Sequence, residues 1–134
     1  MGYVIGVALA VAVGLFARAV GFDKERSFYP VVLIVIAVLY VLFAAIAGST
    51  SAIIVETIPA LLFVAAAVVG FKKSLWVVVG GLAIHGVFDF IHHGIISNPG
   101  VPAWWPAFCL AYDITAAAYL GVLIRVREVP NAGT

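Results

Sequence analysis

The 134-residue sequence contains very little charge. Lysine, arginine, aspartate and glutamate together make up 10% of the residues, whereas 66% are hydrophobic and the mean hydropathy is +1.25. A water-soluble domain of this size cannot build its surface from so few polar side chains. The composition therefore excludes a soluble globular protein and predicts an integral membrane protein surrounded by lipid, with no separate domain outside the bilayer.

Cysteine and clustered basic charge are scarce as well. The net charge is only +1, and the basic residues occur in short groups rather than in one patch, which excludes a nucleic-acid partner. The single cysteine, Cys109, cannot form an intrachain disulfide. The first apolar segment lacks the basic leader of a secretory signal peptide, so we expect it to be a retained helix.

Five apolar runs are present, each of about the 20 residues that a helix needs to cross a hydrocarbon core ~30 Å thick. Glycine, proline, serine or charged residues occupy the connections, where they end helices. We predict an all-α fold in which residues 1–134 form one polytopic transmembrane domain. The five predicted transmembrane helices comprise residues 3–20, 29–47, 52–71, 75–96 and 105–124.

The basic residues predict the orientation of these helices. With five spans, all seven fall on one side of the membrane: Arg18, Lys24, Arg26, Lys72, Lys73, Arg125 and Arg127. The positive-inside rule makes that side cytoplasmic, with the N-terminus outside and the C-terminus inside. Trp104 and Trp105 then lie at the outer interface, where indole rings are enriched.

The fourth predicted helix contains the stretch HGVFDFIHHG, which groups ionisable residues in an apolar segment. Four of its side chains share an arc of about 100°: His85, Asp89, His92 and His93. Neighbouring helices contribute the acids Glu56 and Asp113. A charge at the centre of a membrane helix costs at least about 2.5 kcal/mol, so such residues pair, protonate or bind a ligand.

Residue counting places most of this group at similar depths. At 1.5 Å per residue, His92 lies about 5 Å below the outer surface, Glu56 about 6 Å, Asp89 about 10 Å and Asp113 about 12 Å. His85 is deeper, at about 16 Å. We therefore expect one polar centre in the outer half of the membrane, built from the third, fourth and fifth helices.

A bound divalent cation would offset the charge of three buried acids, and carboxylates and neutral imidazoles are suitable ligands. The predicted metal ligands are Asp89, His92, His93, Glu56 and Asp113. We predict zinc, and iron or copper with redox chemistry stays open because these ligand types do not select one metal. Cys109 is a further candidate ligand, although packing is its more common role.

Catalytic roles are predicted for three residues. Asp113 or Glu56 would be the general base for a zinc-bound water with a pKa of about 7. His85 lies about 12 Å along the helix from His93, too far for both to bind one ion, so we interpret His85 as a proton relay or a buried structural histidine.

Parts of this pattern resemble known metal sites. The spacing Asp89-x-x-His92 is similar to the Glu-x-x-His pair of di-iron helical bundles, although the second such pair is missing. The histidines and aspartate also loosely resemble those of ceramidase-like membrane hydrolases, which hold zinc through histidines. The larger bundle and separate His-x-x-x-His box of those enzymes are missing here.

Over nearly its full length the chain resembles a family of small bacterial integral membrane proteins of unknown function. The stretches that carry the resemblance are FYPVVLIVIA, HGVFDFIHHG and NPGVPAWWPAFCLAYD. It implies a five-helix bundle in the bacterial inner (plasma) membrane and brings no activity with it.

Hydrolysis of a lipid-like or small apolar substrate at a membrane-embedded metal site is the leading hypothesis. A proton or metal-ion transporter is one alternative, although the inner halves of the third and fifth predicted helices lack the ionisable residues of a path across the membrane. An accessory subunit without catalysis, whose polar cluster binds a partner helix, is another. Assembly into a homo-oligomer stays open.

Overall fold

The computed structural model describes residues 1–131, and five α-helices account for most of this part of the chain. They are α1 (Gly2–Val20), α2 (Phe28–Ile46), α3 (Thr50–Lys72), α4 (Leu75–His92) and α5 (Trp105–Arg125), with a short 3-10 turn, η1 (Phe22–Lys24), after α1. The prediction of an all-α fold is confirmed. All five helices are long and apolar enough to cross a membrane.

One predicted boundary is wrong by four residues. The helix expected over residues 75–96 ends at His92, and His93 is its C-terminal cap. Gly94 follows, where the low helix propensity of glycine favours termination, and the amides of Ile95 and Ile96 both bond to the carbonyl of His92. His93 therefore lies outside the helix whose face it was expected to share.

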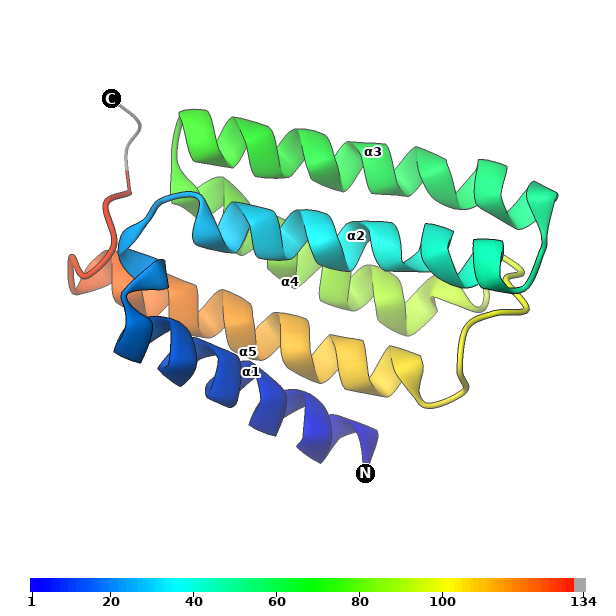
Figure 1. Cartoon of the computed structure of the whole chain (residues 1–134), viewed down its shortest axis with the longest axis horizontal. Coiled ribbons are helices and arrows are strands. Elements are labelled where there is room, and N and C mark those ends of the chain that lie inside the picture. The colour runs from blue at the N-terminus through cyan, green and yellow to red at the C-terminus, as the bar shows by residue number, and fades with distance from the viewer. Residues whose placement is uncertain (132–134) are drawn as a thin grey trace.

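The helices form an elongated antiparallel bundle (Figure 1). α2 packs along α3, α4 packs along α5, and α4 also contacts α3 and, less extensively, α2. α1 lies at the edge of the bundle, where it packs along α5. The α1–α2 and α3–α4 connections lie at one end of the bundle, which we call the basic end because it carries all seven basic residues. The N-terminus and the long α4–α5 connection lie at the opposite end, which we call the loop end.

Small residues on α1 explain its close approach to α5. The buried residues of α1 are Gly6, Ala10, Gly14 and Ala17, which are spaced by about one helical turn. A Cβ atom on Gly6 would lie only 2.3 Å from the carbonyl oxygen of Phe108. Helices in membranes commonly pack through such small residues, because backbones can then approach closely.

The apolar core occupies the half of the bundle toward the basic end. Its fully buried members include Leu33, Leu75, Val78, Leu82 and Leu120. At the basic end itself, Arg18 pairs with Asp23 (3.2 Å) and with Glu128. Arg26 donates to the carbonyls of Phe71 and Pro130, which ties the end of α3 to the chain after α5.

Candidate metal centre

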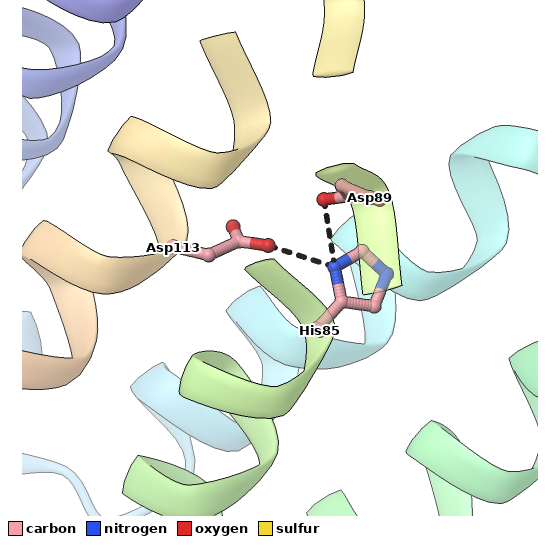
Figure 2. A group of neighbouring side chains, drawn as sticks. All are labelled: His85, Asp89 and Asp113. Atoms are coloured by element: carbon pink, nitrogen blue, oxygen red, sulfur yellow. Dashed lines mark hydrogen bonds and ion pairs between the residues drawn. The ribbon is translucent and has the colours of Figure 1, made fainter. Parts of the chain in front are cut away.

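His85, Asp89 and Asp113 form a compact group between α4 and α5 (Figure 2). Nδ1 of His85 lies 2.7 Å from Oδ2 of Asp113 and 3.1 Å from Oδ2 of Asp89. At most 1% of each residue is exposed. Each offers one ligand atom, and these atoms all lie within 4.8 Å of one another, so the group could hold a metal ion.

The helix register brings these three residues together. His85 and Asp89 are one turn apart on the buried face of α4. Gly86 lets α5 approach that face, because a Cβ atom there would lie 3.1 Å from Cβ of Asp113. Two carboxylates from different helices therefore converge on one imidazole nitrogen.

Several polar atoms of the group lack a partner of their own. Oδ1 of Asp89, Oδ1 of Asp113 and Nε2 of His85 are buried without a hydrogen-bond partner, and Oδ2 of Asp89 shares Nδ1 of His85 with Asp113 and has no hydrogen bond of its own. Figure 2 shows one Asp113 oxygen directed at His85 and the other pointing away from it. Buried carboxylate oxygens are normally hydrogen-bonded, since an unpartnered one loses its hydration without compensation.

The charges of the group also require a partner that the surrounding side chains do not supply. Two ionised carboxylates and a neutral imidazole would place a net charge of about −2 in an apolar interior. Either two protons or one divalent cation would neutralise it. These two states are alternatives, so cation binding at this position would displace protons.

Aromatic side chains enclose the group. The ring of Phe63 meets that of His85 edge to face, with centroids 4.6 Å apart. The hydroxyl of Tyr40 and the thiol of Cys109 lie beside the Asp89 carboxylate and are donors that a small rotation would bring into hydrogen bonds with it; the Tyr40 hydroxyl has no other partner. The surroundings are thus mostly apolar, with two neutral donors close to one of the acids.

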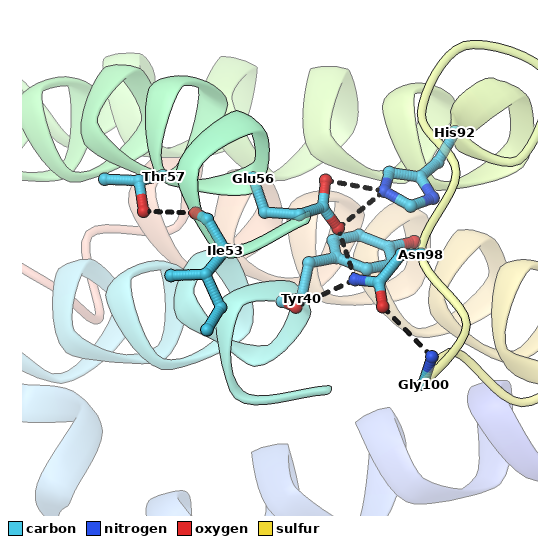
Figure 3. Close-up of polar contacts among 7 residues, drawn as sticks. All are labelled: Tyr40, Ile53, Glu56, Thr57, His92, Asn98 and Gly100. Carbon is cyan, nitrogen blue, oxygen red and sulfur yellow. Dashed lines mark hydrogen bonds and ion pairs between the residues drawn. The ribbon is translucent and has the colours of Figure 1, made fainter. Parts of the chain in front are cut away.

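A second polar cluster lies closer to the loop end and joins Glu56 on α3, His92 on α4 and Asn98 of the α4–α5 connection (Figure 3). Nε2 of His92 is 2.8 Å from both carboxylate oxygens of Glu56. The Asn98 amide donates to Glu56 (2.8 Å) and to the backbone carbonyl of Tyr40 (3.0 Å). The Tyr40 ring stacks on His92 with centroids 3.8 Å apart.

This second cluster has the geometry of a structural latch. Both oxygens of Glu56 have hydrogen-bond partners, and the Asn98 side chain also accepts from the amide of Gly100. The bonds fix the α4–α5 connection against α2 and α3. We therefore interpret the latch, defined as Glu56, His92 and Asn98, as a device that holds the loop rather than as part of the metal centre.

The structure thus separates the residues that the sequence placed in one centre. Asp89 and Asp113 lie with His85, whereas Glu56 and His92 lie in the latch. His92 follows His85 by seven residues, about 10 Å along the helix axis, which is too far for one compact site. His93 is exposed and makes none of the described side-chain hydrogen bonds.

Two contributors were not singled out from the sequence. Asn98 lies in the connection between the fourth and fifth predicted helices, to which no site residue was assigned, and Tyr40 lies within an apolar run. A polar-tipped aromatic residue in the middle of a membrane helix is a weak signal, and so is one amide in a Pro/Gly-rich connection. Their roles depend on the neighbouring helices, which sequence spacing does not specify.

A cavity of about 540 Å³ lies under the α4–α5 connection. It reaches His92 and Asn98 of the latch, and His93 is part of its wall. Asp89 and Asp113 are not among the residues that line it. The latch therefore separates this cavity from the candidate metal centre.

No family model, curated protein or solved structure matches this chain. The resemblance to small five-helix bacterial membrane proteins therefore stays a prediction.

Proposed function

We propose that this chain is an integral membrane protein that binds one divalent metal ion through His85, Asp89 and Asp113. The single observation that carries the proposal is the convergence of two buried carboxylates on one imidazole nitrogen, which leaves Oδ1 of each carboxylate without any partner. A structural pair would be expected to satisfy its oxygens, as Glu56 does in the latch. The centre instead offers acceptors for a cation.

The ligand set is compatible with several metals. One imidazole and two carboxylates provide three protein ligands, the number found in catalytic zinc sites, which keep a fourth position for water or substrate. Zinc remains the leading choice, with iron or copper as alternatives, because similar donors also bind redox metals. In this assignment His85 becomes a ligand rather than a proton relay.

Hydrolysis is the chemistry that we favour for the centre. A bound zinc ion would polarise a carbonyl group and activate water near neutral pH. Asp89 would hold the ion through Oδ2, which already faces His85, and its unpartnered Oδ1 would be placed to accept a proton from water. The apolar enclosure by Phe63 and its neighbours would strengthen these charge interactions.

We also propose that the loop end faces the outside of a bacterial inner membrane, following the basic residues at the opposite end. The transporter alternative is disfavoured by the apolar core between the centre and the basic end, where Leu33, Leu82 and Leu120 are fully buried. An ion leaving the centre in that direction would meet a core that contains tyrosines but no acidic or histidine side chain.

Elemental analysis of the purified protein tests the metal centre. After loading with zinc, iron or copper and removal of free metal, we expect about one ion per chain in the wild type. Asp89→Asn and Asp113→Asn should lose most of it, since each replaces an anionic ligand by a neutral amide of the same shape. Asp23→Asn is the matched control, because Asp23 is equally buried but pairs with Arg18 at the basic end.

Two results would refute the centre. One is a wild-type protein that retains no metal under any of the three loading conditions. The other is a metal content that Asp89→Asn and Asp113→Asn leave equal to that of Asp23→Asn.

A further inference from the structure

A second cavity, of about 260 Å³, lies between α1, α2 and α5 and ends at the candidate metal centre. We call it the crevice. It is lined by Leu9, Ile36, Leu39, Trp105, Phe108, Cys109, Tyr112 and Asp113. Asp113 thus faces His85 on one side and the crevice on the other.

Exposure decreases along the crevice from its rim to its floor. Leu9 on α1 is 43% exposed, whereas Cys109 is 4% and Asp113 is 0% exposed. In a membrane, the rim would meet the hydrocarbon chains of the bilayer rather than water. The crevice is therefore a lateral opening from the lipid toward a buried acid.

The floor carries an unused hydrogen-bond acceptor. Oδ2 of Asp113 contacts His85, but Oδ1 is buried without a partner. The walls are mostly apolar; besides Asp113, polar atoms are contributed only by the side chains of Trp105, Cys109 and Tyr112, and Asp113 is the one acid in the lining. A slender molecule that fills the crevice would bring its innermost atom to this carboxylate.

We propose that the crevice binds a single hydrocarbon chain that enters from the bilayer with its oxygen-bearing end at Asp113. The walls alone cannot select such a molecule, because lipid tails are as apolar as leucine and gain little by moving from lipid into the crevice. The preference for an oxygen-bearing chain must therefore come from Asp113. A hydroxyl end would donate to Asp113 Oδ1, or would reach a metal ion held there, with its oxygen as the ligand.

This inference deepens the proposed function, because it names the substrate class and the side from which the substrate arrives. A single-chain lipid with an alcohol or amide at its end, which can donate to Asp113, is the matching class; an ester has no donor and would be held only through a metal ion bound at the centre. A bulky double-chain lipid would be a poor fit to a crevice of this size.

Photolabelling in bilayer nanodiscs tests the crevice. The probe is a fatty alcohol with a diazirine in its chain, and the reference probe is the alkane in which a methyl group replaces the hydroxyl. In the wild type we expect labelling of the fatty alcohol to concentrate on Leu9 and Leu39, as mapped by mass spectrometry, and to be displaced by unlabelled fatty alcohol.

A filled crevice should lose this labelling. Leu9→Trp places a large side chain at the rim and should lower specific labelling by about tenfold or more. Val11→Trp is the matched control, because Val11 is 46% exposed on the same helix but does not line the crevice. Leu39→Trp blocks the crevice from α2 and tests the same point with a second helix.

The contribution of Asp113 to the preference for the fatty alcohol over the alkane is measured separately. Asp113→Asn should lower the preference for the alcohol over the alkane by about fivefold to tenfold, since a hydrogen bond to a charged acceptor is replaced by one to a neutral acceptor. Labelling that is spread evenly over the lipid-facing surface, or that Leu9→Trp does not change, would overturn the inference. An unchanged alcohol preference in Asp113→Asn would overturn it as well.

The crevice and the metal centre can fail independently. Metal content is determined on the same nanodisc samples. Specific labelling without metal would refute the centre and support the crevice as a lipid site, whereas bound metal without specific labelling would support the centre and refute the crevice.

Discussion

The two halves of the bundle treat buried charge in opposite ways. At the basic end, Asp23 faces the guanidinium of Arg18, and Arg26 donates to backbone carbonyls from two segments. In the other half, Asp89 and Asp113 have only one imidazole between them and several unpartnered oxygens. Both regions bury acids completely, but only one supplies a permanent cation.

This difference separates structural polar groups from candidate functional ones. A buried acid gains stability when the fold supplies its partners, as the latch does for both oxygens of Glu56 and as Arg18 does for Asp23, whose Oδ1 nevertheless lacks a hydrogen bond. A network that leaves acceptors open is stable only if something external completes it. The contrast between the halves is therefore a stronger argument for a ligand than the presence of acids alone.

The largest expected effect is the loss of stabilisation by metal. Ligand that binds only the folded state at about 100 times its dissociation constant adds about 2.7 kcal/mol. Thermal unfolding of the wild type in detergent should therefore shift upward with zinc, and the double variant Asp89→Asn/Asp113→Asn should show no shift. The wild-type shift should also vanish at acid pH, because protons compete for the same ligands.

Asp23→Asn provides the opposite half of that comparison. It removes a buried acid that already has a cationic partner, so the zinc-dependent shift should persist even if the protein is less stable overall. If Asp23→Asn and Asp89→Asn/Asp113→Asn lost the zinc-dependent shift equally, the acids of the two halves would not differ in metal binding.

The next effect concerns the hydrogen bonds of Arg26 at the basic end. Arg26→Ala removes a charged donor to the carbonyls of Phe71 and Pro130, and hydrogen bonds to charged groups contribute about 1.5–3 kcal/mol. We expect a loss of this size in the free energy of unfolding, measured by denaturant titration in detergent micelles. Lys24→Ala is the control at an exposed position in the same connection and should change stability by less than about 0.5 kcal/mol.

A pair of identical substitutions tests the packing of α1. Gly6→Ala forces a methyl group against the Phe108 carbonyl and should cost about 1–3 kcal/mol. Gly80→Ala meets no atom within 4 Å and should be neutral or stabilising by up to about 1 kcal/mol, because alanine favours the helix. Denaturant titration of both variants gives the sign directly, and equal effects would contradict the close approach of α1 to α5.

The smallest effect is expected at the latch. Glu56→Gln replaces a charged acceptor of His92 and Asn98 by a neutral one and should cost about 1 kcal/mol. Limited proteolysis should cut the α4–α5 connection faster, while metal content stays that of the wild type. Loss of metal in this variant would instead return Glu56 to the ligand set that the sequence suggested.

Much of the architecture could be predicted from the sequence, because hydrophobic runs and their breaks directly reflect helix length. The five helices are of this kind. The grouping of ionisable residues was harder, since depth along a helix axis does not specify which faces meet. His85 was set apart by its distance from His93, yet Asp113 on α5 lies beside it.

The small-residue face of α1 could have been recognised from Gly6, Ala10, Gly14 and Ala17 alone. The partner of that face could not, because a stripe of small residues specifies close packing but not against which helix. The latch likewise requires a connection residue, Asn98, to fold back over α3. Such contacts depend on the conformation of the loop, which composition does not determine.

The packing of α1 against α5 has a consequence for biosynthesis. Of the five helices, α1 is synthesised first and its partner α5 last, so α1 cannot form its packing contacts until residues 105–125 have been made. Asp113 arrives on that same final helix. The wall of the crevice that α5 provides and the ligand Asp113 are therefore added at the same time. A nascent chain that lacks α5 offers a metal ion only His85 and Asp89.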